Sequence, residues 1–194
     1  YLISPVFGDL DHKTSLKKIH SSPNQIDGVF QNLEPRNRSP SFNRGKVITK
    51  LLFKQESTPK NLPVVQRKKS DFHAPKGETR FTWFGHSAIL LETNGYKLFI
   101  DPMLGDFAGP LSIISPKRFT RKLPLQAEDL PYLDAVLISH DHYDHLDYPT
   151  IKKIKGKVGM FYVPIGVGSH LIKWGVSPDK VVELDWWDES TLHN

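Results

Sequence analysis

Short apolar runs separated by turn residues mark the chain from Arg80 onward. Two of these runs flank Asn94-Gly95, a pair typical of a two-residue hairpin turn. Later runs alternate with stretches that place apolar residues on one helical face, and this pattern indicates an α/β fold class. Strands are predicted at residues 80–84, 88–92, 96–100, 135–138, 159–163 and 180–184, and helices at 150–155 and 167–174.

One cluster of polar residues follows the apolar run at 133–139, which we interpret as a buried strand. His140, His142, Asp144 and His145 lie at fixed spacing within it. Asp147 and Pro149 then favour the start of a helix. The cluster is therefore predicted on a strand-to-helix loop at the carboxyl end of a strand, where open α/β sheets place their sites. A solvated loop with coincidental histidines is the alternative.

Imidazole and carboxylate groups in this pattern suit zinc or iron. On an extended loop His140 and His142 can point one way, while Asp144 and His145 turn towards a neighbouring point, so two adjacent metals are favoured over one. Two metals would activate a shared water and clamp both oxygens of a displacement, which indicates hydrolysis of an ester, amide or phosphodiester. The chain has no cysteine, which excludes disulfides, cysteine-ligated zinc and thiol catalysis.

The run His140-x-His142-x-Asp144-His145 resembles the signature of the metallo-β-lactamase superfamily. Further segments resemble the branch that contains the N-acylphosphatidylethanolamine-hydrolysing phospholipase D and its bacterial relatives: Thr82-Trp-Phe-Gly-His-Ser87, Phe99-Ile-Asp-Pro102, Pro116-Lys-Arg-Phe119 and Glu183-Leu-Asp-Trp-Trp-Asp188. The resemblance implies an αββα sandwich, of which this chain would supply about the N-terminal half. It also implies a dinuclear zinc (Zn²⁺) hydrolase, most simply a phosphodiesterase acting on a phospholipid. A lactonase, a nuclease or a non-catalytic truncated scaffold are the alternatives, and iron or manganese remain open as metals.

The resemblance also implies a role for each site residue. His140 and His142 would bind one zinc ion, and Asp144 and His145 the second, with Asp144 as the catalytic residue that activates water together with the metals. Asp101 would support the site from behind, since metal-bound imidazoles usually donate their other N–H to a carboxylate; a simple Asp-Pro turn explains it equally well. His86 is not a usual ligand in the family, so we expect it to be a structural, hydrogen-bonded histidine.

The family completes its site with three ligands downstream of the Trp186-Trp187 strand, and this sequence has no counterpart to them. Two ligands per metal fall short of the three that are typical of catalytic zinc sites. We therefore predict that this polypeptide alone cannot hold a full dinuclear centre. A complementary C-terminal polypeptide or a second chain would supply the other ligands, and without it one sheet face would stay uncovered.

Residues 1–78 lack strong periodicity and are rich in Pro, Ser, Asn and Lys. We interpret them as an N-terminal extension that wraps the catalytic part, which is predicted at residues 79–194 as the N-terminal half of a metallo-β-lactamase-like domain. The chain begins at Tyr1 rather than Met, so we expect a trimmed N-terminus.

The net charge of +5 favours anionic partners. Lys117 and Arg118 follow an apolar loop at 107–114, so we predict contact with a small-molecule or phospholipid substrate or with a membrane surface. Core packing of Leu111, Ile113 and Ile114 is the equal alternative. A nucleic-acid partner is not expected. No run approaches about 20 apolar residues, so no transmembrane segment is predicted, and the localisation stays open between soluble and peripheral.

Overall fold

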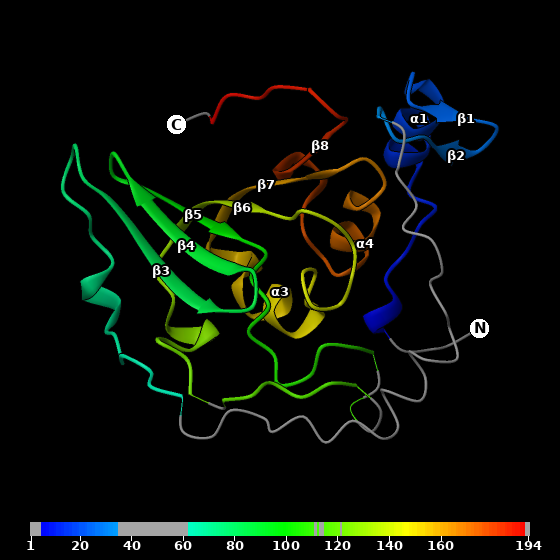
Figure 1. Cartoon of the computed structure of the whole chain (residues 1–194). Helices are drawn as coiled ribbons and strands as arrows, with labels where there is room; N and C mark the ends of the chain where they lie inside the picture. The colour runs from blue at the N-terminus through cyan, green and yellow to red at the C-terminus, as the bar shows by residue number, and fades with distance from the viewer. Residues whose placement is uncertain (1–4, 35–61, 111, 113–114, 121, 193–194) are drawn as a thin grey trace.

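The computed structural model describes residues 5–34, 62–110, 112, 115–120 and 122–192. Its centre is a six-stranded mixed sheet with strands in the order β3-β4-β5-β6-β7-β8 (Figure 1). The strands are β3 (Thr79–Gly85), β4 (Ala88–Thr93), β5 (Tyr96–Ile100), β6 (Leu133–Leu137), β7 (Val158–Pro164) and β8 (Val181–Leu184). β3, β4 and β5 pair antiparallel, and the remaining neighbours pair parallel. All six strands lie where the sequence pattern predicts them.

Two helices follow the parallel strands, α3 (Tyr148–Ile154) and α4 (Gly168–Lys173), both at predicted positions. Asp147 caps α3, because its carboxylate accepts the N–H of Thr150, and a proline occupies the first turn. Gly175 ends the α4 region at φ 85°, a conformation that favours glycine. Short 3₁₀ helices lie at Pro5–Phe7, Lys69–Asp71, Ala127–Asp129, Lys155–Lys157 and Pro178–Lys180.

The N-terminal part holds α1 (Lys13–Ser21) and the small hairpin of β1 (Gln25–Ile26) and β2 (Val29–Phe30), which the sequence analysis did not predict. Long-range hydrogen bonds hold α1 on β8. Ser15 donates to the Glu183 carboxylate at 2.7 Å, and the Lys18 ammonium donates to the Glu183 carbonyl at 2.7 Å. Tertiary contacts, rather than a local pattern, therefore fix this helix.

One face of the sheet forms the core. A row of paired residues crosses four strands, Leu90↔Phe99↔Val136↔Phe161, and all four side chains are fully buried. Ile151 and Ile154 of α3 belong to the same buried cluster. Burying each such side chain contributes about 1.5–3 kcal/mol, so this face supplies most of the driving force for folding.

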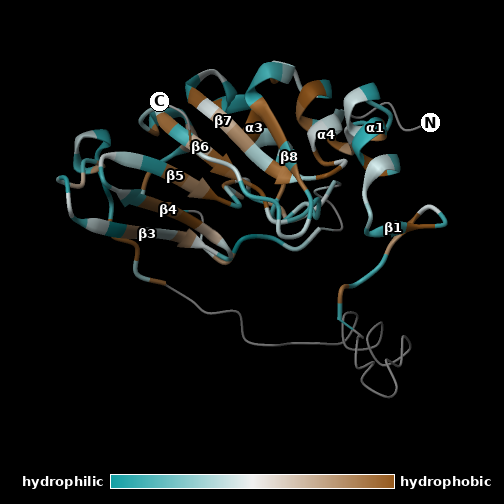
Figure 2. Ribbon diagram, turned by 90° about the horizontal axis from the view of Figure 1, so that it is seen from above, coloured by the Kyte–Doolittle hydropathy of each residue, from teal (hydrophilic) through white to brown (hydrophobic). Residues whose placement is uncertain are grey.

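The opposite face is also apolar but open. The adjacent row, Trp83↔Ile89↔Ile100↔Leu137↔Tyr162↔Val182, contains no buried side chain, and Trp83 is 67% exposed. Figure 2 shows hydrophobic and hydrophilic stretches mixed along the strands, so the two faces are told apart by pairing and burial. A hollow of about 700 Å³ lies on this open face and is lined by Ile100, Tyr162 and Leu184 among others. That another polypeptide covers this face stays a prediction.

The described parts of the extension contact the end of α4 and strand β4. Near the start of the chain, the Trp174 indole donates to the carbonyl of Pro5 at 2.7 Å. At the other end, the N–H of Ala74 donates to the buried Glu92 carboxylate at 3.0 Å. The domain boundary at residue 78 remains a prediction. Residues 35–61 lie outside the described ranges, as do Leu111, Ile113 and Ile114. Over the part that the structure describes, no helix has the length and apolarity needed to cross a membrane.

Candidate metal centre

The histidine and aspartate cluster lies on the loop that joins β6 to α3. Within this loop the N–H groups of His145 and Leu146 both donate to the carbonyl of His142, at 2.9 and 2.8 Å, which closes a tight turn. Leu146 is buried in the core directly after the cluster. The loop is thus held by β6 at one end, and by the buried Leu146 and the Asp147 cap of α3 at the other.

The three imidazole rings of the cluster gather together. The ring centroids of His140 and His142 lie 4.6 Å apart, and those of His140 and His145 lie 4.0 Å apart. Burial lowers the pKa of His140 below its usual value, and the nearby imidazoles of His145 and His142 act in the same direction. A lowered pKa favours the neutral imidazole, which is the form that binds a metal.

Asp101 follows β5 and is almost fully buried beside the cluster. Its carboxylate accepts hydrogen bonds from the N–H of Ser139 at 2.7 Å, from the Ser139 hydroxyl at 2.7 Å and from His145 Nδ1 at 2.8 Å. Its carbonyl also accepts the N–H of Met103 at 2.7 Å, so the residue opens a turn as well. Both alternatives raised by the sequence, a support behind the cluster and an Asp-Pro turn, therefore describe features of the same residue.

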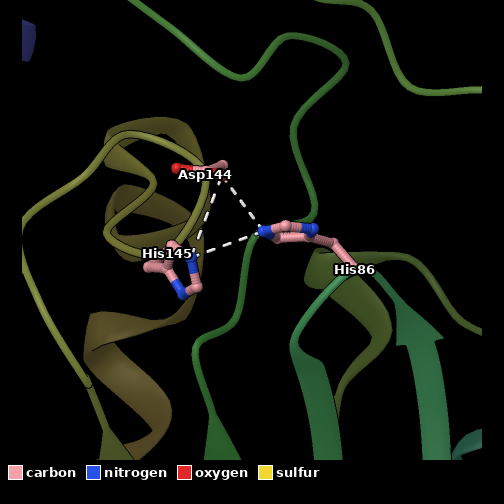
Figure 3. A group of neighbouring side chains, drawn as sticks. All are labelled: His86, Asp144 and His145. Carbon is pink, nitrogen blue, oxygen red and sulfur yellow. Dashed lines mark hydrogen bonds and ion pairs between the residues drawn. The ribbon is translucent and has the colours of Figure 1, made fainter. Parts of the chain in front are cut away.

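His86 also reaches this cluster, as Figure 3 shows. Its Nε2 lies 3.0 Å from Asp144 Oδ2 and 3.4 Å from His145 Nε2. One ligand atom from each of these three residues lies within 4.8 Å of the others, a spacing that could hold a metal ion. His140 and His142 are outside this three-residue group.

The sequence analysis expected His86 to be a structural, hydrogen-bonded histidine. Its imidazole lies within hydrogen-bond range of two predicted metal ligands, and its role stays a prediction. The residue lies in the turn between β3 and β4, 59 positions from His145. The spacing of residues within the His140–His145 motif could not identify His86, because His86 lies outside that motif. The available signal was a Gly-His pair placed between two predicted strands, since such a turn can lie at the same sheet edge as the loop after β6.

Arg118 is half-buried and bonds to the backbone. Its guanidinium donates to the carbonyls of Phe84 at 3.1 Å, Met103 at 2.5 Å and Gly105 at 3.2 Å. Burial lowers its pKa, against the opposing effect of nearby carboxylates. These bonds connect the end of β3, just before the turn that contains His86, to the loop after Asp101. Arg118 therefore holds these two segments together.

Lys117, the other predicted contact residue, is exposed, and its ammonium nitrogen lies 5.6 Å from the centre of the Phe107 ring. Its predicted contact with substrate or membrane stays a prediction. The same holds for the catalytic role of Asp144, whose side chain is about one third exposed.

Comparisons with known proteins show the family to which this chain belongs. A model described as "Beta-lactamase superfamily domain" matches residues 96–194. The chain is 38% identical over 169 residues to an uncharacterized protein of Mycobacterium tuberculosis, covering 85% of this chain and 45% of that protein. It is 38% identical over 134 residues to N-acyl-phosphatidylethanolamine-hydrolyzing phospholipase D 1 of Caenorhabditis elegans, covering 66% of this chain and 37% of that protein.

A third relative is a metal-dependent hydrolase of Pyrobaculum neutrophilum, 40% identical over 75 residues. That match covers 38% of this chain and 28% of the relative. The chain thus spans less than half the length of each of these curated relatives.

Proposed function

This chain belongs to the β-lactamase superfamily, and we propose that it carries metal ligands of a metal-dependent hydrolase. The observation that carries the proposal is the gathering of the His140, His142 and His145 rings on one loop. Asp144 Oδ2 lies 3.8 Å from His145 Nε2, and Asp101 is bonded to His145 from behind. A carboxylate can only accept the hydrogen bond, so Nδ1 of His145 donates and its Nε2 lone pair faces the cluster.

The donor set fits a divalent metal. Neutral imidazole nitrogens and a carboxylate oxygen suit zinc, and the hydrogen bond from His145 to Asp101 is the kind of outer support that metal-bound histidines receive. We propose Zn²⁺, two per complete centre, with iron and manganese as the alternatives for the same donors. When bound, such ions lower the pKa of a water molecule and offset the charge of a developing oxyanion. We propose that the Asp144 carboxylate, which is about one third exposed, orients that water.

For the substrate we propose the phosphodiester of a phospholipid. The support is the likeness to the Caenorhabditis elegans protein, whose name states that it hydrolyses N-acyl-phosphatidylethanolamine. The net charge of +5 is consistent with an anionic substrate or lipid surface, and the exposed Lys117 adds local positive charge beside the apolar ring of Phe107.

We propose further that a complementary polypeptide covers the open sheet face and supplies the remaining metal ligands. The support is physical, since a continuous apolar row that includes Trp83 and Ile89 is left without a buried member. Monomeric proteins seldom expose contiguous apolar surface of this kind, and its burial would stabilise an assembly.

Metal content and turnover of the purified chain test these proposals. Zinc bound per chain is measured by elemental analysis for the wild type, for His142→Ala and for a matched control, His73→Ala, in which the exposed histidine lies outside the cluster. Hydrolysis of N-acyl-phosphatidylethanolamine vesicles is then followed with and without the C-terminal part of a longer relative. We expect metal on the wild type and the control, less on His142→Ala, and turnover only in the presence of the complement.

A wild-type chain that binds no divalent metal would refute the metal centre. A metal-loaded, complemented protein that leaves phospholipids intact but cleaves a lactone or a nucleic acid would refute the substrate alone.

A further inference from the structure

We propose that His86 is a ligand of one divalent metal ion together with Asp144 and His145. This inference rests on the proposed function, because it adds a residue to the same metal centre. It gives one of the two metal positions three protein ligands from this chain, where the sequence analysis found only two.

The separations between the donor atoms carry the argument. They are 3.0 Å between His86 Nε2 and Asp144 Oδ2, 3.4 Å between His86 Nε2 and His145 Nε2, and 3.8 Å between His145 Nε2 and Asp144 Oδ2. Tetrahedral zinc with bonds of about 2.0–2.1 Å separates its ligands by about 3.3 Å. The three observed separations bracket that value, so a single ion could contact all three donors after small side-chain movements.

The protonation pattern points the same way. His145 Nδ1 donates to Asp101 at 2.8 Å, which leaves Nε2 as the unprotonated nitrogen facing His86. His86 Nε2 lies 3.4 Å from this atom and 3.0 Å from Asp144 Oδ2, so without a metal a proton on His86 Nε2 can link the three groups. A divalent cation in place of that proton would bind both Nε2 lone pairs and the Asp144 carboxylate, so the three groups form a donor set for one ion.

The backbone at His86 gives an independent observation. The residue has φ 47°, in the left-handed region that residues with a Cβ rarely adopt, and it follows Gly85 at φ 102° in a turn where the strand register shifts. Glycine or asparagine would fit this turn with less strain. The Trp83 indole fixes the turn by donating to the His86 carbonyl at 2.8 Å. Strain of this kind persists where a side chain has to be aimed, and here it aims the imidazole at the cluster.

Three protein ligands and one open position are the pattern of catalytic zinc sites. The position shared by His86, Asp144 and His145 would therefore bind its ion from this chain alone. His140 and His142 would still need a further ligand, so the prediction that the chain cannot hold a full dinuclear centre is unchanged.

Zinc affinity of the purified chain tests the inference, measured by competition with a chromophoric chelator. His86→Asn and His86→Gly both remove the imidazole and suit the positive φ, so the turn is kept. His73→Ala is the control. We expect the tighter zinc site to weaken by about 100-fold or more in both His86 variants and to be unchanged in the control, since even the loss of a supporting group costs about 10–100-fold.

Two further readouts separate ligation from an ordinary ion pair between His86 and Asp144. Co²⁺ bound to the wild type should give the visible absorption of a four-coordinate site, and His86→Asn should lose it. Without metal, His86→Gly should raise the urea midpoint of unfolding, because the strained turn relaxes. If His86 only pairs with Asp144, the metal-free variant is instead less stable and zinc affinity does not change.

The outcomes also separate this inference from the proposed function. A wild-type chain without any bound metal refutes both. A wild-type chain that binds zinc as tightly as folded His86→Asn and His86→Gly refutes the role of His86 and leaves the metal centre intact.

Discussion

Replacing Asp101 with asparagine should switch the tautomer of His145. Oδ1 of Asp101 accepts the N–H of Ser139 at 2.7 Å, a backbone donor that cannot reverse, so the amide oxygen of the variant has to occupy that position. The amide nitrogen then replaces Oδ2 and faces His145 Nδ1 at 2.8 Å as a donor. Nδ1 has to accept, the ring proton moves to Nε2, and the lone pair that faces His86 and Asp144 is lost.

The size of the effect follows from this geometry. The backbone is undisturbed, because asparagine tolerates the φ of 41° that Asp101 adopts. Loss of an outer carboxylate of this kind lowers metal affinity by about 10–100-fold. That corresponds to about 1.4–2.7 kcal/mol of binding free energy. Folding stability should fall by about 1–3 kcal/mol. The bond to the Ser139 N–H is kept, but the Ser139 hydroxyl and His145 both donate to Oδ2 and would face a donor in the variant.

Two measurements check this prediction. Zinc affinity is compared by chelator competition, and the tautomer of His145 is read from ¹⁵N chemical shifts of the imidazole nitrogens in the metal-free chain. Asp27→Asn is the matched control, because Asp27 also has a positive φ, of 50°, but is exposed and far from the cluster in sequence. A variant that keeps the proton on Nδ1 and binds zinc like the wild type would show that Asp101 does not set the tautomer.

Three further predictions concern the frame around the site. Leu90→Ala should lower the free energy of unfolding by about 2–5 kcal/mol in urea titrations, because the side chain is fully buried in the core row. Asp147→Ala should cost about 1–3 kcal/mol, because it removes the cap of α3 and the acceptor of the Gly105 N–H. Burial lowers the pKa of His170, whose Nδ1 accepts the N–H of Asp9. The contribution of His170 to folding stability should therefore be present above about pH 6.5 and be lost as the pH falls through the lowered pKa of the folded state. Unfolding at about pH 7.5 and pH 5.5 should show this loss in the wild type.

Each of these has a matched control. Leu91→Ala, on the half-exposed face of the same strand, should cost clearly less than Leu90→Ala, and equal costs would contradict the assignment of the core face. Asp129→Ala, at an exposed carboxylate, should leave stability unchanged, and a loss as large as that of Asp147→Ala would contradict the cap argument. His170→Asn keeps an acceptor but cannot titrate, so a pH dependence that survives in it would belong to another group.

Much of the sheet could be read from the sequence, because its strands are short apolar runs bounded by strong turn signals. Asn94-Gly95 fixes the hairpin, and both residues have the positive φ that such a turn requires, 49° and 87°. The family match and the observed mixed sheet confirm the predicted fold class. The helix α1 was not predicted, since it has few apolar residues of its own and depends on Glu183, far along the chain.

Part of the candidate site could likewise be predicted from the sequence, and part could not. His140 to His145 could be found because four donors lie within one loop and their spacing is local. His86 could not, because its relation to Asp144 depends on how the β3–β4 turn meets the loop after β6. The bracing position of Arg118 was equally hidden, since a basic residue beside an apolar loop looks the same whether it faces a ligand or three carbonyls.

The docking of α1 on β8 has a consequence for how the chain folds as it is synthesised. Ser15 and its acceptor Glu183 are separated by 168 residues. At about 5–20 residues per second, the ribosome needs roughly 10–30 s to make the distance between them. During that interval α1 has no partner on β8, whereas the β3–β4–β5 hairpins can already form from neighbouring segments. The first helix of the chain is therefore expected to be among the last elements to dock, and β8 has to emerge before the N-terminal end of the molecule can be fixed.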